Sequence, residues 1–501
     1  MASHGLSKSR ITAWRQCPKR LWLQVNRPEL LEESAQVQQL YQTGNEVGEI
    51  AQGLCPDGIL IEHQNDLAAA LAATQAALVA YPERPLFEAA FQHEGLLVRA
   101  DVLLPTAYGY RMTEVKSSTV VKQYHVDDCA VQAWVLKQNN IQVASVELAH
   151  IDKTFVYRGD GNYHGLLKSS RLDVETKALL DEVPQWVKGA RLTLAGEEPC
   201  IEPGAHCDDP YACPFKAYCI KETRLADEPE YPLSVLCNMR KKLKDELRAL
   251  GYLDARLVPA EYLNDKQLMI QRASKTGKAK FSKRAAKQEM AALSYPRYYI
   301  DFETISTKIP RWEGTSPSVS HVPFQWSCHI EYAPGKLHHD MFLDVSGNDP
   351  RRGCAQQLIK VLAQEGPVLV FSSFEQSRLS ELAKRFPDLA PALLSIKARV
   401  VDLLPMARKH YYHPAMKGSW SIKAILPTIA PDLRYDQLEV GNGGDAQNAY
   451  SEIVHPETTH QRKQQLIDGL SEYCALDTLA MVRLAWFFEG RKVEGINDAA
   501  Q

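Results

Sequence analysis

The acidic side chains of residues 95–118 have the types and spacing needed for metal-assisted hydrolysis. Asp101 lies on an apolar strand, a turn follows around Gly109, and a second strand ends at Glu114-Val115-Lys116. Strand alternation puts Glu114 and Lys116 on one face, and a hairpin would bring Asp101 beside them. Two adjacent carboxylates suit a hard cation such as Mg²⁺, and a nearby lysine can orient an attacking water. The alternative is a surface hairpin with an incidental salt bridge.

Two further polar residues could face the same cleft. Glu88 stands on the preceding strand and Gln132 on the following helix. Ordinary surface polarity explains either of them equally well.

A second set of acids spans the C-terminal part of the chain. The strand YYIDFETI carries Asp301 and Glu303 on one face, and a helix carries Tyr473 and Asp477 four residues apart. Glu375 begins a helix after the strand VLVFSS. Acids from three elements could hold two metal ions about 4 Å apart, with Tyr473 positioning the water.

Each of these residues also has a simpler interpretation. A glutamate at a helix start stabilises the helix dipole, and a tyrosine usually packs. Asp402, in VVDLLPMARKHYY, is interpreted as a helix cap.

Three clustered thiols raise a separate question. Cys207, Cys213 and Cys219 stand at equal six-residue intervals, among 11 cysteines in all. An odd, scattered set argues against a disulfide framework, and clustered thiols favour metal binding. A soft-metal centre usually takes four thiolates, so a fourth cysteine is needed, and four thiolates suit an iron–sulfur cluster or structural zinc. The absence of a tight C-x2-4-C pair favours the cluster, and Cys200 is a spare ligand candidate.

The elements around these residues predict an α/β (α+β) protein of two or three domains. Helical and strand patterns alternate before residue 221, with helices expected over the ranges 31–54, 66–79 and 127–139, and strands over 95–104, 109–117 and 144–151. The alternation returns after residue 294, with a hairpin at 325–345. The boundaries predict domains at 1–221 and 295–490.

The segment between them, 222–294, is expected to be a helical connection. Its stretch 271–289 carries seven basic residues against one acid, in a chain whose net charge is -3. A solvated face and a surface for backbone phosphates are equally good interpretations. The N-terminus has no apolar leader and no stretch is long enough to cross a membrane, so a cytoplasmic protein without a membrane partner is expected.

The N-terminal motif resembles the RecB-like branch of the PD-(D/E)XK nucleases, with a restriction-endonuclease-like fold. The resemblance implies that Asp101, Glu114 and the backbone carbonyl of Val115 hold the metal, that Lys116 is catalytic, and that Gln132 is the helix glutamine. The tyrosine partner of that glutamine is replaced by Val135, and Gly48 stands where the upstream motif has histidine.

Some RecB-like nucleases, including the CRISPR adaptation nuclease and AddB, hold a [4Fe–4S] cluster with one cysteine before the nuclease core and three after it. The lone Cys17 of RQCPKRLW stands where the first one belongs. The resemblance therefore implies the ligands Cys17, Cys207, Cys213 and Cys219, with structural zinc as the alternative cofactor.

The C-terminal motifs resemble the DEDDy branch of RNase H-like 3′–5′ exonucleases. The resemblance implies catalytic, metal-holding roles for Asp301, Glu303, Glu375 and Asp477, with Mg²⁺ or Mn²⁺, and a catalytic Tyr473. Glu375 departs from the aspartate usual in the middle motif. The whole arrangement is similar to a bacterial family that joins the two nuclease types.

These resemblances predict a two-site nuclease that acts on single-stranded DNA or DNA ends in processing, repair or defence. A helicase or another repair or defence protein would be its partner. The alternatives are an RNA-processing exonuclease working through the C-terminal domain, and a non-catalytic iron–sulfur scaffold that binds DNA.

Overall fold

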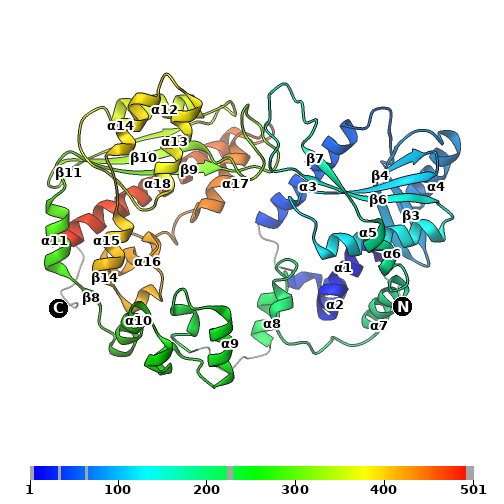
Figure 1. Cartoon of the computed structure of the whole chain (residues 1–501), viewed down its shortest axis with the longest axis horizontal. Coiled ribbons are helices and arrows are strands. Elements are labelled where there is room, and N and C mark those ends of the chain that lie inside the picture. The colour runs from blue at the N-terminus through cyan, green and yellow to red at the C-terminus, as the bar shows by residue number, and fades with distance from the viewer. Residues whose placement is uncertain (1–4, 32–34, 63–65, 223–228, 492–501) are drawn as a thin grey trace. The chain divides into compact units, whose positions relative to one another are not determined.

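The computed structural model describes residues 5–31, 35–62, 66–222 and 229–491. The chain forms two compact units of mixed α/β structure (Figure 1). The first unit comprises residues 1–226 and 307–320, and the second comprises residues 227–306 and 321–501. In the described residues, no helix is long and apolar enough to cross a membrane.

The first unit is built on a mixed sheet in the order β2-β3-β4-β5-β6-β7, with β1 beside β4. The strands are β1 (Leu6–Ser7), β2 (Ile59–Leu60), β3 (Leu86–His93), β4 (Leu96–Thr106), β5 (Gly109–Lys116), β6 (Val143–Ile151) and β7 (Leu167–Arg171). The predicted β4–β5 hairpin is present, and Val102 pairs with Thr113. Gly109 has φ +118°, and a Cβ there would lie 2.3 Å from the Gln142 carbonyl oxygen, so the turn needs glycine.

The two faces of β5 have different neighbours. Met112 belongs to the core shared with α1 (Lys8–Gln16), α4 (Leu67–Ala80), α5 (Gln123–Gln138) and α7 (Val183–Ala195). Val115 packs with Val47 of α3 (Ala35–Gly53) on the opposite face. By alternation Glu114 and Lys116 share the Met112 side and face α1 and α5. The helix predicted over residues 31–54 corresponds to α3, which is described from Ala35 to Gly53. Residues 32–34 lie outside the described residues.

Smaller elements complete the first unit. They are α2 (Pro18–Asn26), η1 (Pro28–Leu30), α6 (Asp173–Leu179), η2 (Ala205–Cys207) and α8 (Lys216–Glu222). Cys17 separates α1 from α2: its backbone is extended, with φ -164°, and it ends one helix while Pro18 begins the next.

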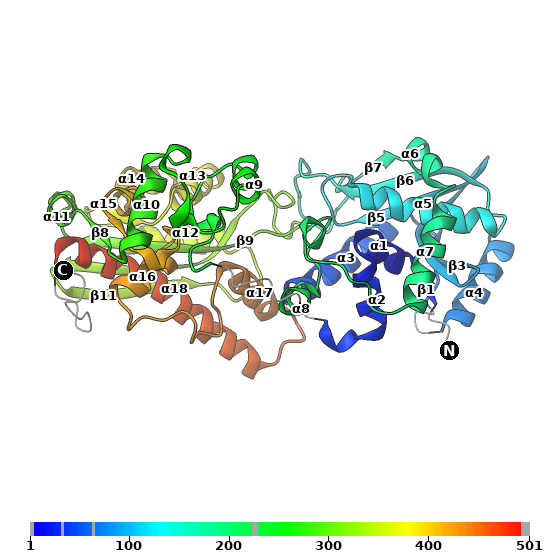
Figure 2. The ribbon, with the colours of Figure 1, turned by 90° about the horizontal axis from the view of Figure 1, so that it is seen from below.

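The second unit has a sheet in the order β11-β10-β9-β12-β13, whose helices α12–α14 and α18 are visible in both views (Figures 1 and 2). Its strands are β9 (Arg297–Ile305), β10 (Val322–Ala333), β11 (Lys336–Leu343), β12 (Val368–Val370) and β13 (Val400–Asp402). The first three are antiparallel, whereas β12 is parallel to β9 and β13.

The alternation of side chains along β9 determines which side of the sheet Asp301 and Glu303 face. Tyr298, Ile300 and Phe302 pack against α12 (Arg351–Val361), α13 (Phe374–Arg385) and α14 (Ala390–Ala398). Tyr299 packs on the other side with Ala480 and Leu484 of α18 (His460–Glu489). Asp301 and Glu303 follow Tyr299 in phase and therefore face α18.

Residues 229–294 contribute to the core of the second unit. They form η3 (Leu233–Val235), α9 (Lys241–Ala249), η4 (Ala255–Leu257), η5 (Ala260–Tyr262), α10 (Asp265–Thr276), β8 (Lys280–Phe281) and α11 (Lys283–Ala291). Leu236, Ile270 and Met290 lie in one hydrophobic core with α18. The predicted connection is thus an integral layer of this unit; its residues 223–228 lie outside the described residues.

The remaining elements of the second unit surround α18. They are α15 (Leu403–His410), β14 (Tyr411–Tyr412), η6 (Pro414–Met416), α16 (Ile422–Ile429) and α17 (Gly443–Ile453). β14 pairs with β8, which ties the basic segment to the C-terminal half of the unit.

The connection from β9 to β10 is unusual because its middle, residues 307–320, belongs to the first unit. We call it the strap. Tyr157 N donates to Thr315 O at 2.9 Å, and Gly314 N donates to Tyr157 O at 2.8 Å. Ile309 is buried in the small core that contains Val47 and Ile151. The strap therefore completes the first unit although it is connected to strands of the second.

Candidate functional site

The first acidic cluster is centred on Glu114, which is 1% exposed. Lys8 Nζ and Lys116 Nζ lie 2.6 and 2.7 Å from the same oxygen, Glu114 Oε1. Gln132 Nε2 donates to Glu114 Oε2 at 2.6 Å. Asp101 Oδ2 accepts the backbone N–H of Val115 at 2.7 Å, which fixes it on the neighbouring strand.

The predicted lysine is held from two sides. Lys116 Nζ also donates to Asp128 Oδ2 at 2.9 Å, and Asp128 Oδ1 accepts from Thr12 Oγ1 at 2.6 Å. Thr12 belongs to α1 and Asp128 to α5, so two helices set the position of the ammonium group.

The two carboxyl groups of this cluster differ in their electrostatics. Burial opposes ionisation of Glu114, but Lys116 and Lys8 outweigh it and hold its pKa far below the usual range. Burial, with the negative charge of Glu114, raises the pKa of Asp101 to about 7. Splitting two carboxyl pKa values in this way is common at functional sites.

The structure places Glu88 near this cluster but in an unusual conformation. It has φ +54°, and burial raises its pKa, with Lys8 acting in the opposite direction. Lys8, Thr12 and Asp128 were not expected from the sequence. Their only local signal is the start of a helix at Lys8, after Ser7, whose side chain accepts from Arg10 N.

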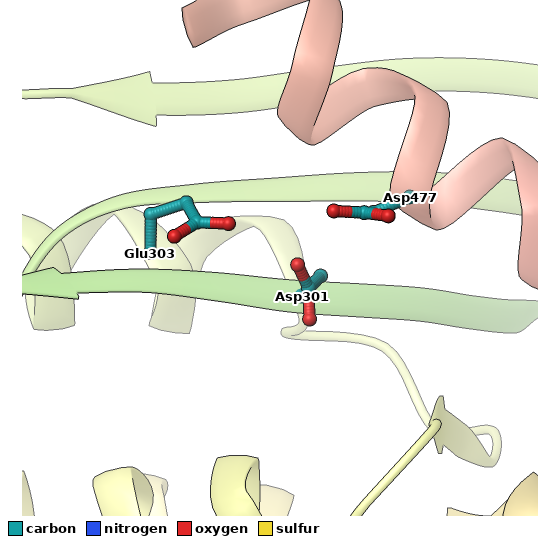
Figure 3. A group of neighbouring side chains, drawn as sticks. All are labelled: Asp301, Glu303 and Asp477. Carbon is teal, nitrogen blue, oxygen red and sulfur yellow. The ribbon is translucent and has the colours of Figure 1, made fainter. Parts of the chain in front are cut away.

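The second acidic cluster brings three predicted side chains together. Asp301 and Glu303 of β9 and Asp477 of α18 each offer an oxygen, and these atoms lie within 4.8 Å of one another. Figure 3 shows the three carboxylates directed toward one shared space. Such a set of oxygen ligands is what Mg²⁺ or Mn²⁺ requires.

Glu375 completes the acidic lining. It is 3% exposed at the start of α13, where Ser372 Oγ donates to its Oε2 at 3.0 Å. With Asp301, Glu303, Tyr473 and Asp477 it lines an open cleft of about 540 Å³. All five residues predicted for this site thus border one cleft.

The carboxyl groups of the cleft resist ionisation without a cation. Burial and the charges of neighbouring acids raise the pKa of Glu303 to about 8 and that of Asp301 well above its usual value. Burial raises the pKa of Glu375 to about 7. Buried, mutually repelling carboxylates are stabilised by a divalent cation, so the donor set fits a metal.

Two residues that sequence reasoning missed organise the cleft. Lys423 Nζ donates to Tyr473 Oη at 3.1 Å and to Gly441 O at 2.8 Å. Tyr435 Oη donates to Asp477 Oδ1 at 2.5 Å. Lys423 also lowers the pKa of Glu303 against the effect of burial. Asp402 is the helix cap predicted for it, since its side chain accepts from Leu404 N at 2.8 Å.

The four predicted cysteines line one pocket. Cys17, Cys207, Cys213 and Cys219 border it together with Lys19 and Arg20. Burial raises the pKa of Cys213 and of Cys219, and Arg20 and Lys19 respectively oppose that effect. Cys200 is exposed.

Hydrogen bonds to backbone carbonyl oxygens hold the loop that contributes three of the four cysteines. Gln16 Nε2 donates to both His206 O and Tyr211 O at 2.8 Å, and Cys213 N donates to Cys207 O at 2.7 Å. Four thiols thus border one pocket, with Lys19, Arg20 and Lys216 beside them. Among the described residues, the group whose ligand atoms lie within 4.8 Å of one another is the carboxylate set Asp301, Glu303 and Asp477, so the thiols are not gathered that closely.

Comparisons with known proteins match parts of the chain. A family model described as "Domain of unknown function (DUF2779)" matches residues 298–421. "Uncharacterized protein UU173" of Ureaplasma parvum serovar 3 is 26% identical over 229 residues, which cover 41% of this chain and 33% of that protein. The chain thus matches about a third of that relative's length.

A solved structure titled "Crystal structure of SSO0001" is 12% identical, with a TM-score of 0.24, and the match covers 44% of this chain and 87% of that one. The residues that the family model matches, 298–421, include Asp301, Glu303 and Glu375.

Proposed function

We propose that the chain is a metal-dependent DNA nuclease with two hydrolytic sites. The observation that carries the proposal is the convergence of Asp301, Glu303 and Asp477 within 4.8 Å, in a cleft that Glu375 and Tyr473 also line. Oxygen ligands from separate elements around an open cleft are the equipment for hydrolysing phosphodiesters.

The second unit is the proposed exonuclease, of RNase H-like fold. Its strand order, three antiparallel strands followed by two parallel ones, supports that assignment. Asp301, Glu303, Glu375 and Asp477 would hold Mg²⁺ or Mn²⁺, and the ion would supply activation of water and stabilisation of the leaving oxygen. Tyr473 orients the attacking water through its hydroxyl, and Lys423 fixes that hydroxyl.

The first unit is the proposed RecB-like nuclease, with a restriction-endonuclease-like core. Asp101, Glu114 and the carbonyl of Val115 would hold its metal. Lys116, anchored by Asp128, directs a positive charge at the site and orients a nucleophile beside the phosphate.

The cysteine pocket is the proposed site of a structural [4Fe–4S] cluster bound by Cys17, Cys207, Cys213 and Cys219. Its ligands lie about 190 residues apart in sequence, so the cluster would join both ends of the first unit. We propose a role in DNA processing, repair or defence, with an unidentified helicase or defence protein supplying unwinding.

The test of both sites uses anaerobically purified protein, end-labelled single- and double-stranded DNA and RNA, and Mg²⁺ or Mn²⁺. Lys116→Ala, Asp301→Asn and the double variant are compared with wild type. Glu381→Gln is the matched control, because Glu381 lies on α13 but pairs with Arg378, outside the acidic set.

Each single variant should lose a different product pattern by at least about a hundredfold, and the double variant should lose both. Wild-type protein that cleaves nothing with either metal would contradict the proposal and favour the scaffold. Cleavage of RNA alone through the second site would favour the RNA-processing alternative.

A further inference from the structure

The basic segment presents an unusual concentration of unpaired charge. Seven exposed side chains of the stretch 271–289 form no ion pair with any described residue: Arg272, Lys275, Lys278, Lys280, Lys283, Arg284 and Lys287. Exposed arginines elsewhere in the same unit do have partners, such as Arg352 with Asp388 and Arg462 with Glu439.

The single acid of this segment does not offset its charge. Glu289 accepts from Lys409 and lies 3.1 Å from His410 Nε2, so its carboxylate is directed to α15. In a chain of net charge -3, this segment is a local positive field rather than part of a balanced surface.

Three of the basic residues border a groove of about 480 Å³. Arg272, Lys278 and Lys280 line it, with Leu268 and Met269 of α10 as apolar wall residues and Asp265 as the one acid against three cations. Three cations along one groove supply the positive charge that the phosphates of an extended single strand require.

The groove and the acidic cleft share neighbouring elements. Lys266 Nζ, on α10, lies 4.2 Å from the centre of the Trp420 ring, and Trp420 lines the acidic cleft. At about 1.5 Å per residue, Arg272 is only about 9 Å further along the α10 axis than Lys266. Lys266, beside the cleft residue Trp420, and Arg272, in the groove, therefore lie on one helix less than two turns apart.

We propose that this groove binds the phosphodiester backbone of a single-stranded nucleic acid whose terminus enters the acidic cleft. The path into the cleft rests on the proposed function, whereas binding in the groove does not. Because the groove would contact phosphates, which DNA and RNA share, it should bind both kinds of strand with similar affinity. In this arrangement the groove supplies binding affinity, and the acidic cleft hydrolyses the strand.

The test replaces the groove charges and compares them with distant ones. The groove variant is Arg272→Glu/Lys278→Glu/Lys280→Glu. The matched control is Lys336→Glu/Lys360→Glu/Lys384→Glu, three exposed lysines on β11, α12 and α13 with the same change in charge. Fluorescence anisotropy with labelled oligo-dT and oligo-U of about 15 nucleotides, in EDTA, measures binding at several salt concentrations.

The groove variant should bind both strands at least about tenfold more weakly, and the slope of log K against log salt should fall by about 2. The control variant should stay within about twofold of wild type. An equal loss in both variants, or no loss in the groove variant, overturns the proposal. Loss with only one of the two strands also overturns backbone recognition.

A second measurement uses the p-nitrophenyl ester of thymidine monophosphate with Mn²⁺. This small substrate reaches the cleft but is too short for the groove, so its turnover by the groove variant should match that of wild type. A fall in turnover beyond that of the control would mean that the substitutions disturb the fold or the cleft, which overturns the proposal. If wild type hydrolyses neither the ester nor an oligonucleotide, the proposed function fails, while anisotropy still decides on the groove.

Discussion

At the scale of single residues, Lys8 and Lys116 share one carboxylate oxygen but are not equivalent. Lys116 is also bonded to Asp128, whereas Glu114 is the single ion-pair partner of Lys8 among the described residues. A cation entering beside Glu114 would therefore displace Lys8 more easily than Lys116. Lys8 occupies part of the electrostatic role that a metal would take.

Lys8→Met should therefore raise the affinity of the first site for Mn²⁺. Removing one like charge beside the metal is worth at least about 1 kcal/mol, or at least about fivefold in affinity. Calorimetric titration in an Asp301→Asn/Asp477→Asn background, which silences the second site, measures it. Lys122→Met is the control, since Lys122 is exposed at the start of α5. Unchanged or weaker Mn²⁺ binding by Lys8→Met would rule out this competition.

The acidic cleft predicts a pH dependence of stability. Because the folded-state pKa of Glu303 is raised from 4.5 to about 8, the folded protein binds this proton more tightly than the unfolded chain. Its contribution to stability is therefore fully present below pH 4.5 and is lost as the pH rises through about 8. Glu375, with a pKa of about 7, acts in the same direction.

Metal-free protein should consequently show a lower unfolding temperature of the second unit at pH 8 than at pH 6. Mn²⁺ should raise that temperature more at pH 8, by about 4 °C or more, because the ionised carboxylates bind it. Calorimetry of wild type and Asp301→Asn at both pH values measures the difference. An equal Mn²⁺ effect in the variant would show that the metal binds elsewhere.

At the scale of elements, α1 connects the first acidic cluster to the cysteine pocket. Its first residue, Lys8, contacts Glu114, Thr12 contacts Asp128, and Gln16 holds two carbonyls of the cysteine loop. Cys17 ends the helix. We therefore expect a loss of order at the cysteine pocket to reach the first acidic cluster through this helix.

Cys17→Ser should remove the broad visible absorbance expected of a cluster and lower the stability of the first unit by several kcal/mol. Lys116-dependent cleavage should fall with it, while Asp301-dependent cleavage should persist. Cys200→Ser is the control and should keep both colour and activity, since Cys200 is exposed. A colourless wild type that contains zinc would assign the thiols to zinc instead.

The elements could be predicted from the sequence more completely than the sites. Alternation in YYIDFETI suffices to place Asp301 and Glu303 on one face of β9, and the turn around Gly109 suffices for the β4–β5 hairpin. Lys8 and Lys423 lie far along the chain from their partners, Glu114 and Tyr473, and tertiary packing alone brings each pair together. Local sequence periodicity carries no information on such long-range contacts, so sequence reasoning missed both lysines.

At the scale of the molecule, the chain passes between its two units three times, after residues 226, 306 and 320. The strap lies between β9 and β10 in sequence, yet Ile309 and Trp312 are 6% and 8% exposed within the first unit. Each unit has its own hydrophobic core. The local stability of the strap should therefore follow the first unit.

Ile309→Ala should destabilise the first unit by about 2–5 kcal/mol through the cavity that it leaves. Hydrogen exchange should then quicken in β6 and around Tyr163, with little change in α12–α14. Val319→Ala, at a strap residue that is 55% exposed, is the control and should have a small effect. Faster exchange in α12–α14 but not in β6 would contradict the assignment of the strap.

The strap also limits how these units can be recombined. Neither unit is a single continuous stretch of sequence, so a cut near residue 226 leaves the first unit without part of its core. A chimera that joins the first 226 residues of one relative to the remainder of another would bring a foreign strap to Val47 and Ile151. We therefore expect the two units to be inherited together rather than exchanged separately. Substitutions in the strap should be accompanied by compensating substitutions among the residues that it packs against, such as Val47 and Ile151.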